Sequence, residues 1–125
     1  MSVVSSNGCR VLVVDDDADN RELVLELLQH EGFAASSAEN GAVALSLLEN
    51  GLDPDLILTD LLMPVMSGWD LCETVKSKPH WQSIPIIVLC GMPAEQRGKL
   101  HVDDAFEKPT DTEQLLSRIR ELCGI

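Results

Sequence analysis

Short runs of apolar and β-branched residues alternate along this chain with longer segments whose apolar residues recur at helical spacing. The clearest runs are residues 10–14, 55–59 and 85–90, which are uninterrupted in the manner of strands buried on both faces. Two weaker strands are expected at residues 33–36 and 105–107. Strands that alternate with helices in this way predict a parallel sheet of five strands with helices on both faces, the doubly wound α/β class.

Helices are expected in the segments between these strands. Leu23, Leu27 and Leu28 recur at helical spacing within residues 17–30, and Gly32 supplies a stop signal. Residues 91–101 contain a proline near their start and few apolar side chains, so we expect a shortened or irregular fourth helix, or a flexible loop, in this segment. The other expected helices cover residues 40–49, 69–77 and 111–123.

Length and charge restrict the classes of function. A chain of 125 residues with 45% hydrophobic residues suffices for one domain, which we place at residues 10–125 after an N-terminal tail at residues 1–9. The net charge of -12 argues against direct binding of nucleic acid or an anionic membrane, because phosphate groups require a basic face. Acidity also keeps a small protein in solution, so the charge alone assigns no function. The chain shows no signal peptide and no apolar stretch of about 18 residues, and we expect a cytoplasmic protein.

The chain has four cysteines, at positions 9, 72, 90 and 123. None belongs to a C-x-x-C pair, and most lie in apolar or helical surroundings. The spacing therefore predicts reduced, buried thiols rather than a disulfide framework or a zinc site.

Polar residues follow the strands at the ends where a parallel sheet binds ligands. Asp15 and Asp16 follow the first strand, Asp60 the third, Cys90 ends the fourth, and Lys108 follows the fifth. Because the carboxyl ends of parallel strands lie at one edge, we expect these five side chains to lie on a common rim.

Carboxylates gathered on such a rim indicate a metal site for a phosphoryl group. Mg²⁺ prefers a few carboxylate oxygens together with water and phosphate oxygens. Asp16 and Asp60 would bind the metal directly, Asp15 through water, and Leu62 through its backbone carbonyl. Attack by the Asp60 carboxylate on a phosphoryl donor would give an aspartyl phosphate, with Lys108 paired to the phosphoryl oxygens.

Four segments of the chain read VLVVDDD, DLILTDLLMPVMSGWDL, IPIIVLC and FEKP. They resemble the signature segments of the CheY-like receiver domain of bacterial two-component response regulators, and the resemblance extends from about residue 10 to the C-terminus. It implies a flavodoxin-like fold with strand order 2-1-3-4-5. It also implies Asp60 as phosphoacceptor, Asp15 and Asp16 as metal-site acids, Lys108 as the phosphate-contacting lysine and Mg²⁺ as the cofactor.

The resemblance implies partners as well. The donor would be a phosphohistidine on a sensor histidine kinase or a histidine phosphotransfer protein. The output would pass through contacts with an unknown downstream protein, and the chain would not be an enzyme apart from hydrolysis of its own aspartyl phosphate.

Two positions depart from the pattern of this family. Cys90 stands where the family usually has Thr or Ser, and a thiol is a weaker hydrogen-bond donor than a hydroxyl. Ala105 stands where the family usually has Tyr or Phe, and the neighbouring Phe106 should point to the opposite face of its strand. These departures support an alternative function, a pseudo-receiver that acts as a protein-interaction scaffold without phosphorylation.

The acid triplet Asp15-Asp16-Asp17 also fits other interpretations. Acids at this point also suit the N-cap and first turn of a helix. The triplet resembles a calcium loop as well, but Asn20 replaces the required glycine and a strand precedes it, so we reject that match. A small phosphohydrolase is the weakest interpretation, because the chain offers no dedicated general base.

Overall fold

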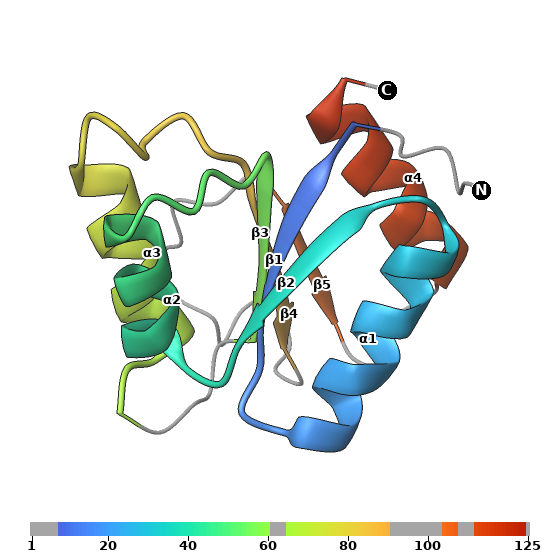
Figure 1. Ribbon diagram of the computed structural model, residues 1–125, viewed down its shortest axis with the longest axis horizontal. Helices are drawn as coiled ribbons and strands as arrows, with labels where there is room; N and C mark the ends of the chain where they lie inside the picture. The colour runs from blue at the N-terminus through green and yellow to red at the C-terminus, as the bar shows by residue number, and fades with distance from the viewer. Residues whose placement is uncertain (1–7, 61–64, 91–103, 108–111, 125) are drawn as a thin grey trace.

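The computed structural model describes residues 8–60, 65–90, 104–107 and 112–124, with only the backbone described for 90 and 104–107. Five strands form one parallel sheet in the order β2-β1-β3-β4-β5. The sheet runs through the middle of the molecule in Figure 1. The expected α/β class with a parallel sheet is confirmed. The strands are β1 (Arg10–Val14), β2 (Ala34–Ala38), β3 (Leu56–Asp60), β4 (Ile86–Cys90) and β5 (Asp104–Glu107).

Helices cover both faces of this sheet (Figure 1). On one face lie α1 (Ala18–His30) and α4 (Thr112–Cys123), and on the other lie α2 (Gly41–Glu49) and α3 (Gly68–Ser77). Alternate side chains of each central strand therefore enter different cores, as Leu12 and Val14 pack with α2 and α3 while Val11 and Val13 pack with α1 and α4. The expected irregular fourth helix at residues 91–101 lies outside the described residues.

Polar side chains fix where three of the helices begin. Asp17 accepts hydrogen bonds from the backbone N–H groups of Asp19 and Asn20 at the start of α1. Asn40 caps α2 and Ser67 caps α3 in the same manner. At the other end of α1, Gly32 adopts a φ of 90°, which only glycine accepts without strain. Each helix thus starts or stops within a residue or two of the predicted position.

The expected bounds of one strand were wrong. Strand β2 runs over Ala34–Ala38 rather than residues 33–36, because its small side chains pair with β1 along the full length from Arg10 to Val14. Phe33 precedes the strand and packs into the core. Leu23 has 65% of its surface exposed, since the side of α1 that meets the sheet carries Leu28 instead.

The cysteines also differ from the expectation of reduced thiols. Cys9 and Cys123 form a disulfide between the residue before β1 and the last residue of α4, with their Cα atoms 6.2 Å apart. Cys72 is a free, buried thiol on α3. Sequence spacing missed the pair because its members are 114 residues apart and meet only when α4 packs beside β1.

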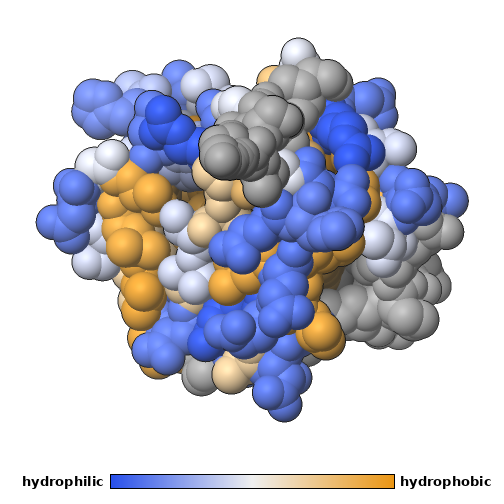
Figure 2. All heavy atoms as spheres, turned by 45° about the vertical axis from the view of Figure 1, so that its right-hand side comes forward, coloured by the Kyte–Doolittle hydropathy of each residue, from blue (hydrophilic) through white to orange (hydrophobic). Residues whose placement is uncertain are grey.

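One face of the molecule is largely hydrophilic. The side of the molecule shown in Figure 2 carries mostly hydrophilic side chains, with apolar side chains in separate groups. Within the described ranges, no helix combines the length and the apolar character that crossing a membrane requires.

Candidate functional site

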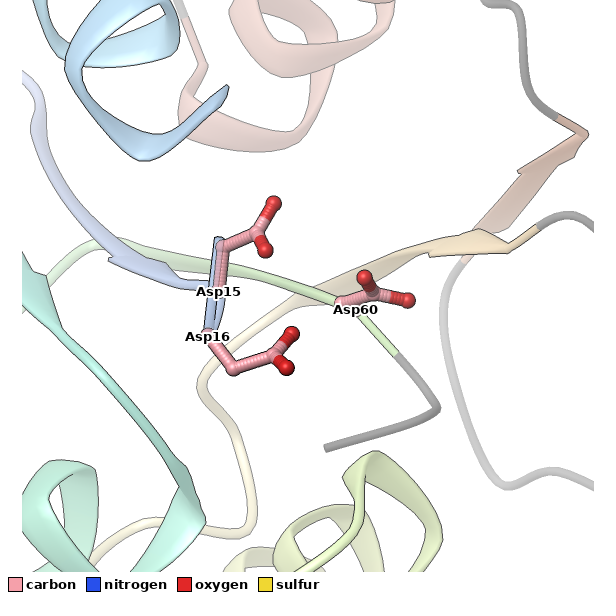
Figure 3. A group of neighbouring side chains, drawn as sticks. All are labelled: Asp15, Asp16 and Asp60. Carbon is pink, nitrogen blue, oxygen red and sulfur yellow. The ribbon is translucent and has the colours of Figure 1, made fainter. Parts of the chain in front are cut away.

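The candidate site lies at the carboxyl ends of β1 and β3, which are neighbours in the sheet. Val14 pairs with Thr59, so the residues that follow β1 reach the same edge as Asp60, the last residue of β3. Figure 3 shows the carboxyl groups of Asp15, Asp16 and Asp60 gathered at this edge. The structure thus brings together three acids that are 45 positions apart in the sequence at their widest, as the expected rim requires.

The three carboxylates form a compact oxygen cluster. One oxygen from each of Asp15, Asp16 and Asp60 lies within 4.8 Å of the others. Asp15 is buried, Asp60 is half-buried and Asp16 is exposed. Negative groups held this close repel one another, and a divalent cation would relieve the repulsion. Carboxylate oxygens are the ligands that Mg²⁺ prefers, and the exposed Asp16 leaves the cluster open to the water molecules that this ion retains.

Asp15 is held on every polar atom by neighbouring groups. Its Oδ1 accepts a hydrogen bond of 2.9 Å from the backbone N–H of Asp17, and its Oδ2 accepts one from the side-chain amide of Asn20. Its carbonyl oxygen accepts a 2.7 Å bond from the guanidinium of Arg21, and its N–H donates to the carbonyl of Ala38. The loop between β1 and α1 is therefore fixed from the strand side and from the helix side.

The acid triplet divides between two roles. Asp17 caps α1, as the capping interpretation predicted for the group. Asp15 and Asp16 instead join Asp60 in the cluster, as the metal-site interpretation predicted for them.

Asp60 is anchored through its neighbour in the strand. Thr59 is buried, and its hydroxyl donates a 2.9 Å hydrogen bond to the carbonyl oxygen of Asp60. The backbone of Asp60 also lies in register with Leu89 of β4. Pairing with β4 and the Thr59 hydroxyl thus hold the backbone of Asp60, while its half-buried side chain reaches the acid cluster.

Several predicted site residues remain untested by this geometry. Leu62 and Lys108 lie outside the described residues, and so does the side chain of Cys90. The backbone of Cys90 ends β4, one position beyond the residue paired with Asp60.

Sequence reasoning missed Asn20 and Arg21, which contact Asp15 from the first turn of α1. An amide in that turn, just after an acid triplet, was the available signal.

Comparison with known proteins points to one family. Residues 11–120 match the family described as response regulator receiver domain. An uncharacterized 14.6 kDa protein of Leptolyngbya boryana is 35% identical over 117 residues, which cover 90% of this chain and 88% of that protein. The sensor histidine kinase TmoS of Ectopseudomonas mendocina is 39% identical over 96% of this chain, but the match spans only 12% of the kinase.

Solved structures agree in fold. The signal receiver domain of a histidine kinase from Syntrophus aciditrophicus superposes with a TM-score of 0.88 at 29% identity, covering 94% of this chain and 91% of that one. A response regulator from Thermotoga maritima, solved in complex with Mg²⁺ and BeF, has a TM-score of 0.81 at 32% identity and covers 91% of this chain and 98% of that one.

Proposed function

Because this chain belongs to the response regulator receiver domain family of two-component signalling, we propose that it accepts a phosphoryl group on Asp60 and signals through protein–protein contacts. The observation that carries the proposal is the cluster of Asp15, Asp16 and Asp60, whose oxygens lie within 4.8 Å of one another. Family membership gives the class of the domain, and this cluster supplies the acceptor and a metal-binding group in one place.

The transfer requires a nucleophile that is exposed yet fixed. An oxygen of the Asp60 carboxylate attacks the phosphorus, the bond from phosphorus to the imidazole nitrogen of a phosphohistidine breaks, and that nitrogen keeps the electron pair. The product is an aspartyl phosphate. Asp60 suits this role, because its carboxylate is half-exposed while its carbonyl is held by Thr59. The donor is a sensor histidine kinase or a histidine phosphotransfer protein.

Mg²⁺ fits the cluster as the cofactor of this reaction. Asp16 and Asp60 would hold it directly, Asp15 through water, and Leu62 through its carbonyl. When bound, the ion offsets the negative charge that collects where an anionic phosphoryl group meets a carboxylate cluster. A role for Asp15 through water, rather than in direct contact with the ion, agrees with its burial and with the protein hydrogen-bond donors on both of its oxygens.

Lys108 and Cys90 complete the proposed site. Lys108 contacts the phosphoryl oxygens as a positive group, and Cys90 occupies the position next to them at the end of β4. The thiol of Cys90 is a weak hydrogen-bond donor. It therefore stabilises the phosphorylated conformation that the downstream protein recognises less than a hydroxyl would.

The test is phosphorylation by a small donor. Incubation with Mg²⁺ and acetyl phosphate or phosphoramidate should add the mass of one phosphoryl group to the wild-type protein, measured on the intact chain. Asp60→Asn should remain unmodified, and so should the wild type in excess chelator. Asp53→Asn, which makes the same change at an exposed aspartate before β3, should be modified like the wild type.

The opposite result selects the alternative function. A wild-type protein that takes no phosphoryl group from any of these donors or from a phosphohistidine protein, and that binds its partner as well with Asp60→Asn, is a phosphorylation-independent scaffold.

A further inference from the structure

We propose that Asn20 is a positioning residue that orients the Asp15 carboxylate and thereby sets the affinity of the acid cluster for Mg²⁺. This inference rests on the proposed function, in which the cluster binds that ion. It concerns a residue of α1 that is not itself an acid and that has no proposed contact with the phosphoryl group.

The first step is the state of the Asp15 carboxylate. Asp15 has only 4% of its surface exposed, so water contributes little to holding it. The Asp17 N–H engages Oδ1 and the Asn20 amide engages Oδ2. Each carboxylate oxygen has two lone pairs, so one on each oxygen stays available for the water that would link Asp15 to the ion. The two donors together fix the direction in which those lone pairs point.

The second step is how firmly Asn20 itself is held. It occupies the first turn of α1, and its backbone N–H donates to the capping carboxylate of Asp17 at 3.2 Å. Arg21, the next residue, donates to the Asp15 carbonyl at 2.7 Å. The first turn of α1 therefore binds both the side chain and the backbone of Asp15. Because a helix is more rigid than a loop, these contacts hold Asp15 firmly.

The third step is why an amide suits this position. Its N–H satisfies one oxygen of a buried carboxylate and brings no charge. An aspartate in its place would add a fourth negative charge and remove the donor. A lysine would donate to the oxygen, but its positive charge would neutralise part of the negative charge that attracts the cation. Asn20 leaves the whole negative charge of the cluster available to Mg²⁺ while it fixes one of its members.

The experiment measures Mg²⁺ binding to the unphosphorylated protein by isothermal titration calorimetry. Asn20→Ala should raise the Kd for Mg²⁺ by about 10- to 100-fold, the usual effect of removing a group that orients a metal-binding residue. Asn50→Ala is the matched control, because it also removes a hydrogen bond from a side-chain amide, of 2.7 Å to the Ser46 carbonyl, at the exposed residue that follows α2. Its Kd should equal that of the wild type.

A second readout separates positioning from general stability. Asn20→Ala should need more Mg²⁺ for half-maximal phosphorylation and approach the wild-type rate when Mg²⁺ is saturating. A variant that melts at a lower temperature but binds Mg²⁺ with the wild-type Kd would overturn the inference, because Asn20 would then serve folding alone. If Asn20→Ala does not fold by circular dichroism, Asn20→Leu fills the same space without the donor and is held to the same criterion.

Failure of this inference can be told from failure of the proposed function. A wild-type protein phosphorylated on Asp60, combined with an unchanged Kd in Asn20→Ala, overturns the role of Asn20 only. A weakened Kd in the variant, combined with no phosphorylation of the wild type, overturns the proposed function only. A wild-type protein that binds no Mg²⁺ overturns the inference as well.

Discussion

Val65 has a backbone φ of 70°, in the left-handed region that residues with a branched β-carbon rarely adopt. Its side chain is also 84% exposed, so little packing repays the strain. We expect Val65→Asn to stabilise the protein by about 1 kcal/mol, because asparagine tolerates this conformation. Urea unfolding followed by circular dichroism measures the change.

The control for this substitution is Leu23→Asn. Leu23 is the other exposed large apolar residue in the described part of the chain, and it lies in regular helix. Asparagine has a lower helix propensity than leucine, so this variant should be slightly less stable than the wild type. If both substitutions stabilise equally, removal of exposed apolar surface explains the effect and the strain at Val65 does not.

At the scale of elements, the segment that precedes α3 meets the start of α2. The N–H of Gly41 donates to the carbonyl of Met66 at 3.4 Å, and a Cβ on Gly41 would lie 2.7 Å from Cγ of Met66. Close approach of this kind is open only to glycine. Met66 lies between β3 and α3 in the sequence, so this contact joins the segment before α3 to a helix on the sheet face away from α1.

We expect Gly41→Ala to destabilise the protein by about 1 to 2 kcal/mol, although alanine favours helix, because the new methyl group displaces Met66. The double variant Gly41→Ala/Met66→Ala should be more stable than the sum of the two single changes predicts. Urea unfolding of the four proteins gives the coupling energy. Strictly additive effects would show that the two residues do not compete for this space.

At the scale of the whole molecule, the disulfide between Cys9 and Cys123 joins the two ends of the domain. Arg120 and Glu31 add an ion pair of 2.8 Å between α4 and the end of α1. A disulfide that closes a loop of this length lowers the conformational entropy of the unfolded chain. In the chain-entropy description this stabilises the folded protein by about 4 to 5 kcal/mol. Both connections hold α4 against the face of the sheet that α1 covers.

We expect reduction of this disulfide to lower the Tm by roughly 15 to 20 °C. Differential scanning calorimetry with and without a dithiol reductant measures the change. Cys9→Ala should melt like the reduced wild type in either condition, whereas Cys72→Ala should keep the full response to reductant. Burial raises the pKa of the Cys72 thiol to about 11, against the weaker opposing effect of Lys76, so this thiol should not exchange with the disulfide near neutral pH. Equal melting temperatures with and without reductant would contradict the prediction.

Most of the elements could be read from the sequence because local chemistry specifies them. Unbroken apolar runs such as residues 86–89 suit only buried strands, and the capping residues Asp17, Asn40 and Ser67 mark helix starts. The bounds of β2 were predicted less well. Apolar residues lie on several sides of α1, and packing against the sheet decides that Leu28 is the buried one. Pairing with β1 extends β2, a strand of small residues, beyond its predicted end.

The sequence by itself determined the α/β class and the acids of the site, since a parallel sheet places the residues after its strands at one edge whatever the details of packing. Only the tertiary structure decided that Cys9 meets Cys123 and that Asn20 and Arg21 hold Asp15. Those contacts depend on where two helices lie against the sheet and on how single side chains turn. No local sequence pattern fixes the placement of these helices or the orientation of these side chains. The first depends on packing between groups distant along the chain, and the second on which side-chain rotamer the packed structure allows.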